Sequence, residues 1–251
     1  FEHITFDEAL AKAKAENKLV FMDCYTSWCG PCKYMTETIF PQEKAGEFFN
    51  PKFVCVKFDM EKGEGPELAK RFGVRAYPTF LILRPDGTVQ HKIVGGGDLD
   101  KFIAKVEKGL NKKTSLDYLN KIYEKGKMNQ KQLMTYSVVL NEAYEKDKSE
   151  KVGKELDAVL KEKDKMKKEY WPILERSPYG SDNFKLVLNN IGTFNKNIGK
   201  EKVDKYLTSC YTNAINNTMR PNTKEPLKVL QQIQEELTKL DLADQATLTR
   251  S

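Results

Sequence analysis

Two cysteines separated by two residues are the part of this sequence best suited to chemistry. Cys29 and Cys32 lie after the apolar run 18–23 and before a segment with helical character, which is a strand-loop-helix junction. A thiolate at a helix N-terminus is stabilised by free backbone N–H groups and by the helix dipole. We therefore predict that Cys29 is a nucleophile.

The second cysteine has a different predicted task. Cys32 follows Cys29 by about one helical turn and should lie beneath it, where it can attack a mixed disulfide formed at Cys29. Pro31 pre-sets the backbone of the first turn and stiffens the loop. The alternative is half of a zinc site, but a structural site needs four ligands. The chain has no second Cys-x-x-Cys pair, and its histidines are His3 and His91, so we favour redox chemistry without a metal.

The acid before the motif is also informative. Asp23 interrupts the apolar run Leu19 to Cys24, which is typical of a strand covered on both faces. Burial of a carboxylate without a partner raises its pKa, and a raised-pKa acid near a dithiol can move a proton. A partly exposed acid at a strand end is the open alternative.

Over residues 1–112 the chain resembles the thioredoxin superfamily. The resemblance rests on Trp28-Cys29-Gly30-Pro31-Cys32-Lys33, Asp23, Lys57, Tyr77-Pro78-Thr79 and Gly95. It implies that Asp23 accepts the proton of Cys32 and that Lys57 is its charged neighbour. It also implies a cis-proline at Pro78 that faces the dithiol. The substrate-binding residues expected on this basis are Trp28, Gly30, Pro31, Tyr77, Pro78 and Gly95.

One position departs from the thioredoxin pattern. Thioredoxin carries a proline five residues after the second cysteine, and this chain has Glu37. The following Thr38-Ile39-Phe40 and the run 48–54 look more like the thioredoxin-like domain of DsbD-type reductants and their soluble envelope relatives. The resemblance therefore points to a periplasmic or cell-envelope protein, and removal of a signal peptide would explain a chain that starts at Phe1. A cytoplasmic location is the alternative, which unpaired cysteines favour.

The length of 251 residues suggests two domains. Residues 1–112 are expected to form an α/β thioredoxin-like domain with a central mixed sheet flanked by helices. From Thr114 glycine and strand-like runs become sparse, and apolar stripes recur at helical spacing. Residues 113–251 are expected to form an all-α domain, either a helical bundle or an irregular helical repeat, of unassigned role.

The individual elements are predicted from periodicity and from turn residues. Helices are expected at 6–17, over one or two segments of 33–49, at 66–72 with Gly73 as its end, and after Asp98 as an N-cap. Strands are expected at 19–24, at 53–59 and within 74–83, and the last of these continues through the turn 84–88 into a hairpin.

Charge and hydropathy exclude two classes of function. The net charge of +6 arises from 42 basic and 36 acidic residues, which alternate on predicted helix faces such as Glu145-Lys146-Asp147-Lys148. No one-sided basic patch with aromatics marks a nucleic-acid site. No apolar run approaches the ~20 residues of a membrane span.

The predicted function is that of a thiol:disulfide oxidoreductase that reduces protein disulfides through Cys29 and Cys32. Its partners would be disulfide-containing proteins and an upstream thiol reductant, and it would need no cofactor beyond the dithiol. The alternatives are a redox-gated binding protein, whose helical half captures a partner, and a disulfide isomerase. Cys24, Cys55 and Cys210 lie in apolar stretches and are predicted to be small core residues.

Overall fold

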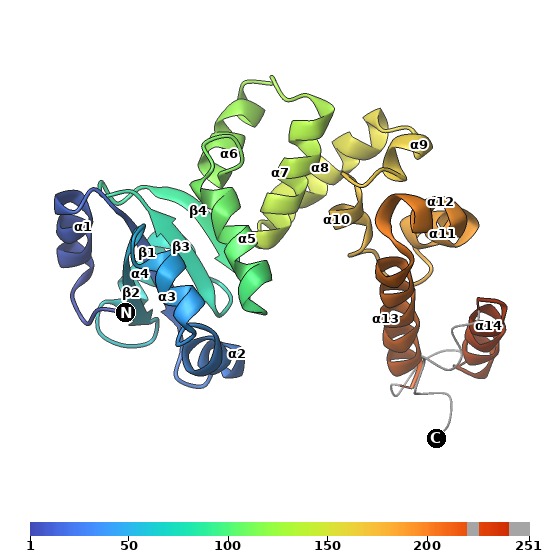
Figure 1. Cartoon of the computed structure of the whole chain (residues 1–251), viewed down its shortest axis with the longest axis horizontal. Helices are drawn as coiled ribbons and strands as arrows, with labels where there is room; N and C mark the ends of the chain where they lie inside the picture. The colour runs from blue at the N-terminus through green and yellow to red at the C-terminus, as the bar shows by residue number, and fades with distance from the viewer. Residues whose placement is uncertain (220–225, 241–251) are drawn as a thin grey trace. The chain divides into compact units, whose positions relative to one another are not determined.

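The computed structural model describes residues 1–219 and 226–240. The chain divides into two compact units, Phe1–Leu156 and Asp157–Ser251 (Figure 1). The first unit contains a four-stranded mixed sheet with flanking helices, and the second is helical over its described residues. This confirms the predicted combination of a thioredoxin-like α/β domain with an all-α region. None of the described helices is long and apolar enough to cross a bilayer.

The sheet has the strand order β2-β1-β3-β4. Its strands are β1 (Leu19–Tyr25), β2 (Phe53–Asp59), β3 (Thr79–Leu83) and β4 (Val89–Val94). β1 is parallel to β2 and antiparallel to β3, and β3 is antiparallel to β4. The central position of β1 explains its continuous apolar sequence, because both of its faces are covered by helices.

Helices cover both faces of the sheet, and each face has its own hydrophobic core. α1 (Phe6–Ala15) and α4 (Gly65–Phe72) share a core with one face of β1, which presents Val20, Met22 and Cys24. The other face packs on the helices between β1 and β2 and on α5 (Leu99–Leu110), with Phe21 at its centre. The alternation of side chains along a strand produces this division.

Three short helices lie between Cys29 and β2. α2 (Gly30–Tyr34) continues into a π-helical turn, η1 (Met35–Ile39), and α3 (Glu43–Phe49) follows after a break at 40–42. The break contains Pro41, which has no backbone N–H with which to continue the helical hydrogen bonds. Glu37 lies within the π-helical turn, where the N–H of Phe40 bonds to the carbonyl of Met35 at 2.9 Å. The helix is therefore irregular because this turn is closed by a hydrogen bond across five residues instead of four. The proline that thioredoxin has at this position is not needed for the irregularity.

Local capping sets several helix ends, and two of these caps, Gly73 and Asp98, were predicted from the sequence. Gly73 ends α4 with a φ of 60°, which is a conformation that favours glycine. The carboxylate of Asp98 accepts hydrogen bonds from the N–H groups of Asp100 and Lys101 at the start of α5. Thr5 and Glu8 form a capping box at the start of α1.

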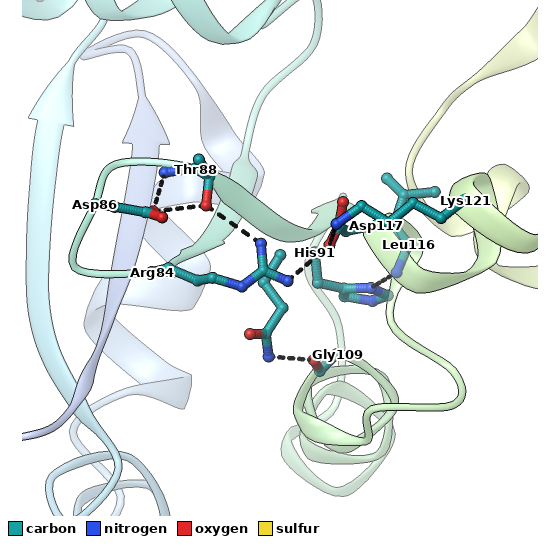
Figure 2. A network of polar contacts seen from close by, with 9 residues as sticks. Arg84, Asp86, Thr88, His91, Gly109, Leu116, Asp117 and Lys121 are labelled. Atoms are coloured by element: carbon teal, nitrogen blue, oxygen red, sulfur yellow. Dashed lines mark hydrogen bonds and ion pairs between the residues drawn. The ribbon is translucent and has the colours of Figure 1, made fainter.

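The helices after α5 begin on the edge of the sheet. α6 (Leu116–Glu124) and α7 (Gln130–Glu142) both pack on β4, the edge strand. Figure 2 shows the junction: the imidazole of His91 meets the first residue of α6, and Arg84 bonds to Asp117 at 2.7 Å. The extension thus covers a sheet edge that would otherwise be open to other chains.

The compact unit consequently runs beyond the domain boundary expected at residue 112. It ends at Leu156, within α8 (Lys146–Val159), because α6 and α7 share contacts with the sheet. Residue 112 is where the thioredoxin-like elements end, and the division into domains at that residue stays a prediction. Residues 220–225 and 241–251 of the expected helical domain lie outside the described residues.

The second unit is built around aromatic side chains. Trp171 is buried against Phe194 and Tyr206, and Phe184 packs on Tyr211. Aromatic residues around 170–180 therefore serve packing. The described helices of this unit are α9 (Glu162–Lys165), α10 (Trp171–Leu174), α11 (Asp182–Asn189), α12 (Ile191–Ile198), α13 (Lys200–Thr218) and α14 (Pro226–Lys239).

Candidate active site

The cysteine pair lies where β1 gives way to α2. Cys29 is the N-cap of α2, and its Sγ accepts a hydrogen bond from the backbone N–H of Cys32 at 3.1 Å. Pro31 occupies the first turn, where a backbone N–H would have no helical partner. A negative charge on Sγ of Cys29 would therefore be stabilised by the end of the helix.

The two cysteines are joined in a disulfide, with their Cα atoms 5.3 Å apart. Cys29 is 4% exposed and Cys32 is 2% exposed, so the difference in accessibility expected from the sequence is small in this oxidised state. The asymmetry between them lies in capping: Cys29 is at the N-cap and Cys32 is inside the helix. The neighbouring Trp28 is 66% exposed and marks the surface above the pair.

Asp23 is buried in β1, as predicted. It is 1% exposed, and neither of its carboxylate oxygens has a hydrogen-bond partner among the described residues. Burial raises the pKa of Asp23 to about 7, and the positive charge of Lys57 lowers it in part. Lys57 is the register partner of Asp23 on β2. This carboxyl group can therefore gain or lose a proton near neutral pH.

The Tyr77-Pro78 peptide bond is cis in the structure. Pro78 is buried, and its carbonyl accepts a hydrogen bond from the N–H of Gly95 at 2.8 Å. Gly95 has a φ of 82°, which is strained for other residues. The hydroxyl of Thr79 donates to the carbonyl of Ala76 at 2.7 Å, which holds the other side of this loop.

Trp28 and Tyr77 are in direct contact. Their rings meet edge to face with centroids 5.9 Å apart. The indole Nε1 of Trp28 donates to the carboxylate of Glu61, at 3.0 Å from Oε1 and 3.1 Å from Oε2. Glu61 was not singled out in the sequence, because it follows β2 in a loop and nothing in its neighbours predicts contact with the motif.

The glycines near residue 96 serve internal packing. A Cβ at Gly96 would lie 2.5 Å from Sδ of Met35, a buried residue of the π-helical turn. The N–H of Gly97 lies 3.4 Å from the same sulfur atom. The absence of a side chain at Gly96 therefore leaves room for Met35, and Gly95 supplies the positive φ that this turn needs.

The three remaining cysteines are free thiols. Burial raises the pKa of Cys24 well above its usual range, raises that of Cys55 to about 11, and raises that of Cys210. Thiolate is therefore scarce at these positions near neutral pH. Among the described residues, no cluster of three or more His, Cys, Asp and Glu side chains could hold a metal ion.

Sequence comparison agrees with this geometry. A thioredoxin family profile matches residues 1–108. Thioredoxin-1 of Drosophila melanogaster is 37% identical over 86 residues, which cover 32% of this chain and 76% of that protein. A thioredoxin H-type protein of Oryza sativa subsp. indica is 38% identical over 102 residues, which cover 40% of this chain and 78% of that protein. The chain belongs to the thioredoxin family.

Among solved structures, this thioredoxin-family chain is similar to a candidate disulphide-isomerase from Bacteroides thetaiotaomicron. The identity is 45%, with 44% of this chain and 92% of the other covered and a TM-score of 0.42. Membership of the thioredoxin family together with the Cys29–Cys32 pair makes the chain a thiol:disulfide oxidoreductase. Its substrates are disulfides, and a reductant or oxidant partner restores the pair.

Proposed function

We propose that this thioredoxin-family chain reduces protein disulfides. The observation that carries the proposal is the placement of Cys29 at the N-cap of α2, with its Sγ accepting the N–H of Cys32. The Gly30-Pro31 pair resembles the reducing members of the superfamily. No histidine lies between the cysteines to stabilise the thiolate further, which disfavours an oxidase.

The reaction has two exchange steps. The thiolate of Cys29 attacks one sulfur of the substrate disulfide, and the other substrate sulfur leaves as a thiolate. The thiolate of Cys32 then attacks Sγ of Cys29, which releases the second substrate sulfur and forms the Cys29–Cys32 disulfide. Two electrons pass to the substrate, and an upstream thiol reductant returns two electrons to the pair.

Asp23 is proposed to accept the proton of Cys32 before the second step. Its pKa of about 7 supports this role, because the carboxyl group is neither fully ionised nor fully protonated at neutral pH. Lys57 would favour the ionised form. Trp28, Gly30, Pro31, Tyr77, Pro78 and Gly95 are proposed to form the surface that meets the substrate.

Insulin reduction with dithiothreitol tests the activity. The full chain should precipitate insulin B chain faster than dithiothreitol alone, and Cys29→Ser should abolish the acceleration. Cys210→Ser is the matched control, because it removes a thiol outside the site. If Cys29→Ser accelerates the reaction as well as the unaltered chain does, the proposal is wrong.

Trapping tests the assigned order of the cysteines. Cys32→Ser should hold substrates on Cys29 as mixed disulfides, whereas Cys29→Ser should hold few. The trapped proteins also identify the substrates. The envelope location predicted from the sequence is tested separately, by fractionation of cells with an antibody to the chain.

A further inference from the structure

A cavity of about 670 Å³ lies beside the loop that contains Pro78. Arg75, Ala76 and Thr79 line it from the thioredoxin domain, together with Lys92 of β4. The other lining segment is the corner between α7 and α8, residues 144–148, which belongs to the helical extension. All of these residues lie within the first compact unit.

The cavity adjoins the segment proposed to meet the substrate. Ala76 precedes Tyr77-Pro78 and Thr79 follows it, and both line the cavity. The hydroxyl of Thr79 donates a hydrogen bond to the carbonyl of Ala76. A polypeptide that lies against Tyr77-Pro78 can therefore continue into the cavity. An extended chain reaches about 3.3 Å farther with each residue, so a few residues beside a disulfide are enough.

The wall made by the α7–α8 corner is formed in advance. Tyr144 has a φ of 59°, and the N–H of Glu145 bonds to the carbonyl of Leu140 at 2.9 Å, which ends α7 sharply. The carboxylate of Glu145 pairs with Nζ of Lys92 at 2.6 Å and ties the corner to β4. A preformed wall lowers the entropy lost when a ligand binds.

Apart from the ion pair between Lys92 and Glu145, the charged residues that line the cavity have a net positive charge. Lys92 and Glu145 neutralise each other. Of the remaining lining residues, Arg75, Lys146 and Lys148 form no ion pair with any carboxylate of the described chain, and Asp147 offsets only one of them. Cations without an acidic partner beside an open cavity complement an acidic ligand.

We propose that this cavity binds an acidic, extended segment that flanks the disulfide of a protein substrate. The inference rests on the proposed reductase function, because a polypeptide substrate is what brings such a segment to Tyr77-Pro78. It gives the first part of the helical extension a role in the choice of substrate.

Binding can be measured without redox chemistry. The full chain with Cys29→Ser and Cys32→Ser is titrated against a short fluorescein-labelled peptide with glutamates on both sides of two serines, followed by fluorescence anisotropy. A peptide with lysines in place of the glutamates is the matched probe. We expect the acidic peptide to bind more tightly, and its advantage to fall when salt is raised from about 0.05 M to about 0.5 M.

Charge reversal locates the binding. Lys146→Glu with Lys148→Glu should weaken binding of the acidic peptide about fivefold, the effect of two partly exposed charge contacts. Lys125→Glu with Lys127→Glu makes the same change in net charge on the exposed loop after α6, outside the cavity, and should change binding less than about twofold. Equal losses in the two variants, equal binding of the two peptides, or no binding of the acidic peptide would each overturn the inference.

A small neutral disulfide separates this inference from the proposed function. Hydroxyethyl disulfide has no flanking peptide, so the chain with both cysteines intact, reduced beforehand with dithiothreitol, should reduce it equally with and without the Lys146→Glu and Lys148→Glu changes. Reduction without selective peptide binding would reject the cavity alone. Selective peptide binding without any reduction would reject the reductase function and leave the cavity as a peptide site.

Discussion

The Nδ1 atom of His91 accepts a hydrogen bond from the backbone N–H of Leu116 at 3.1 Å. His91 is on β4 and is fully buried, and Leu116 is the first residue of α6. The imidazole thus satisfies one of the N–H groups that have no partner inside the helix. This bond fixes the start of the helical extension to the edge of the thioredoxin sheet.

Removal of the imidazole should loosen this attachment. We expect His91→Ala to lower the free energy of unfolding by about 2 to 4 kcal/mol, from the cavity it leaves and the buried N–H it deprives of a partner. Urea denaturation followed by circular dichroism measures the change. His3→Ala removes the exposed histidine and should stay within about 0.5 kcal/mol of the unaltered chain. Similar effects of both changes would show that the bond contributes little.

His91 and Asp23 should contribute in opposite directions to the pH dependence of the free energy of unfolding. Burial, with a contribution from Lys108, lowers the pKa of His91 to about 3, whereas burial raises that of Asp23 to about 7. The stability from His91 is present above pH 6.5 and is lost as pH falls toward 3. The stability from Asp23 is present below about pH 4 and is lost as pH rises through about 7.

Between about pH 4 and pH 6.5 each term changes the free energy of unfolding by about 1.4 kcal/mol per pH unit, in opposite directions. The two therefore nearly cancel in the unaltered chain. Asp23→Asn removes the contribution of Asp23 and leaves that of His91, so the free energy of unfolding should rise with pH across this window. Urea midpoints at several pH values measure it, and an unchanged pH profile in Asp23→Asn would contradict the assigned burial.

Gly109 in α5 should not tolerate alanine. Its added Cβ would lie 2.7 Å from ring atoms of His91 and from Cδ1 of Ile82. Alanine gains about 1 kcal/mol of helix propensity, but overpacking of a core costs about 1 to 3 kcal/mol, so we expect a net loss. Gly46→Ala in α3 is the contrast, because its Cβ would be at an ordinary 3.5 Å from Asn50. Thermal melting should fall for the first variant and hold or rise for the second.

Glu61 should position Trp28 for substrate binding. Glu61→Gln keeps the shape and removes the charge that the indole N–H meets, and a hydrogen bond to a charged group contributes about 1.5 to 3 kcal/mol when shielded from water. Because Trp28 is exposed, water competes for this hydrogen bond, and we expect the loss of binding free energy to be smaller than that range. The expected result is a rise of about threefold in KM for insulin with little change in kcat. Glu67→Gln, an exposed acid of α4, is the control. Equal KM values for both variants would exclude a positioning role.

Much of the candidate site could be predicted from sequence because its signals are local. The spacing of Cys29 and Cys32, the apolar run around Asp23 and the residues that cap helices each act within a few positions along the chain. Those signals are sufficient to predict the strand, the loop and the helix that carry the dithiol. The role of Asp23 rested on its anomalous place in an apolar strand, and the structure confirms its burial.

Long-range contacts were not predictable in the same way. His91 gave no sign that it would meet Leu116, and Glu61 gave none that it would meet Trp28, because each pair is separated by more than 20 residues. The cavity was not predictable for the same reason, because it forms only when the corner between α7 and α8 packs against Lys92, a residue distant in the sequence. Sequence alone determined the chemistry of the dithiol, since that depends on neighbours along the chain. The tertiary structure decided what surrounds the dithiol, since packing brings together residues whose separation in sequence carries no signal.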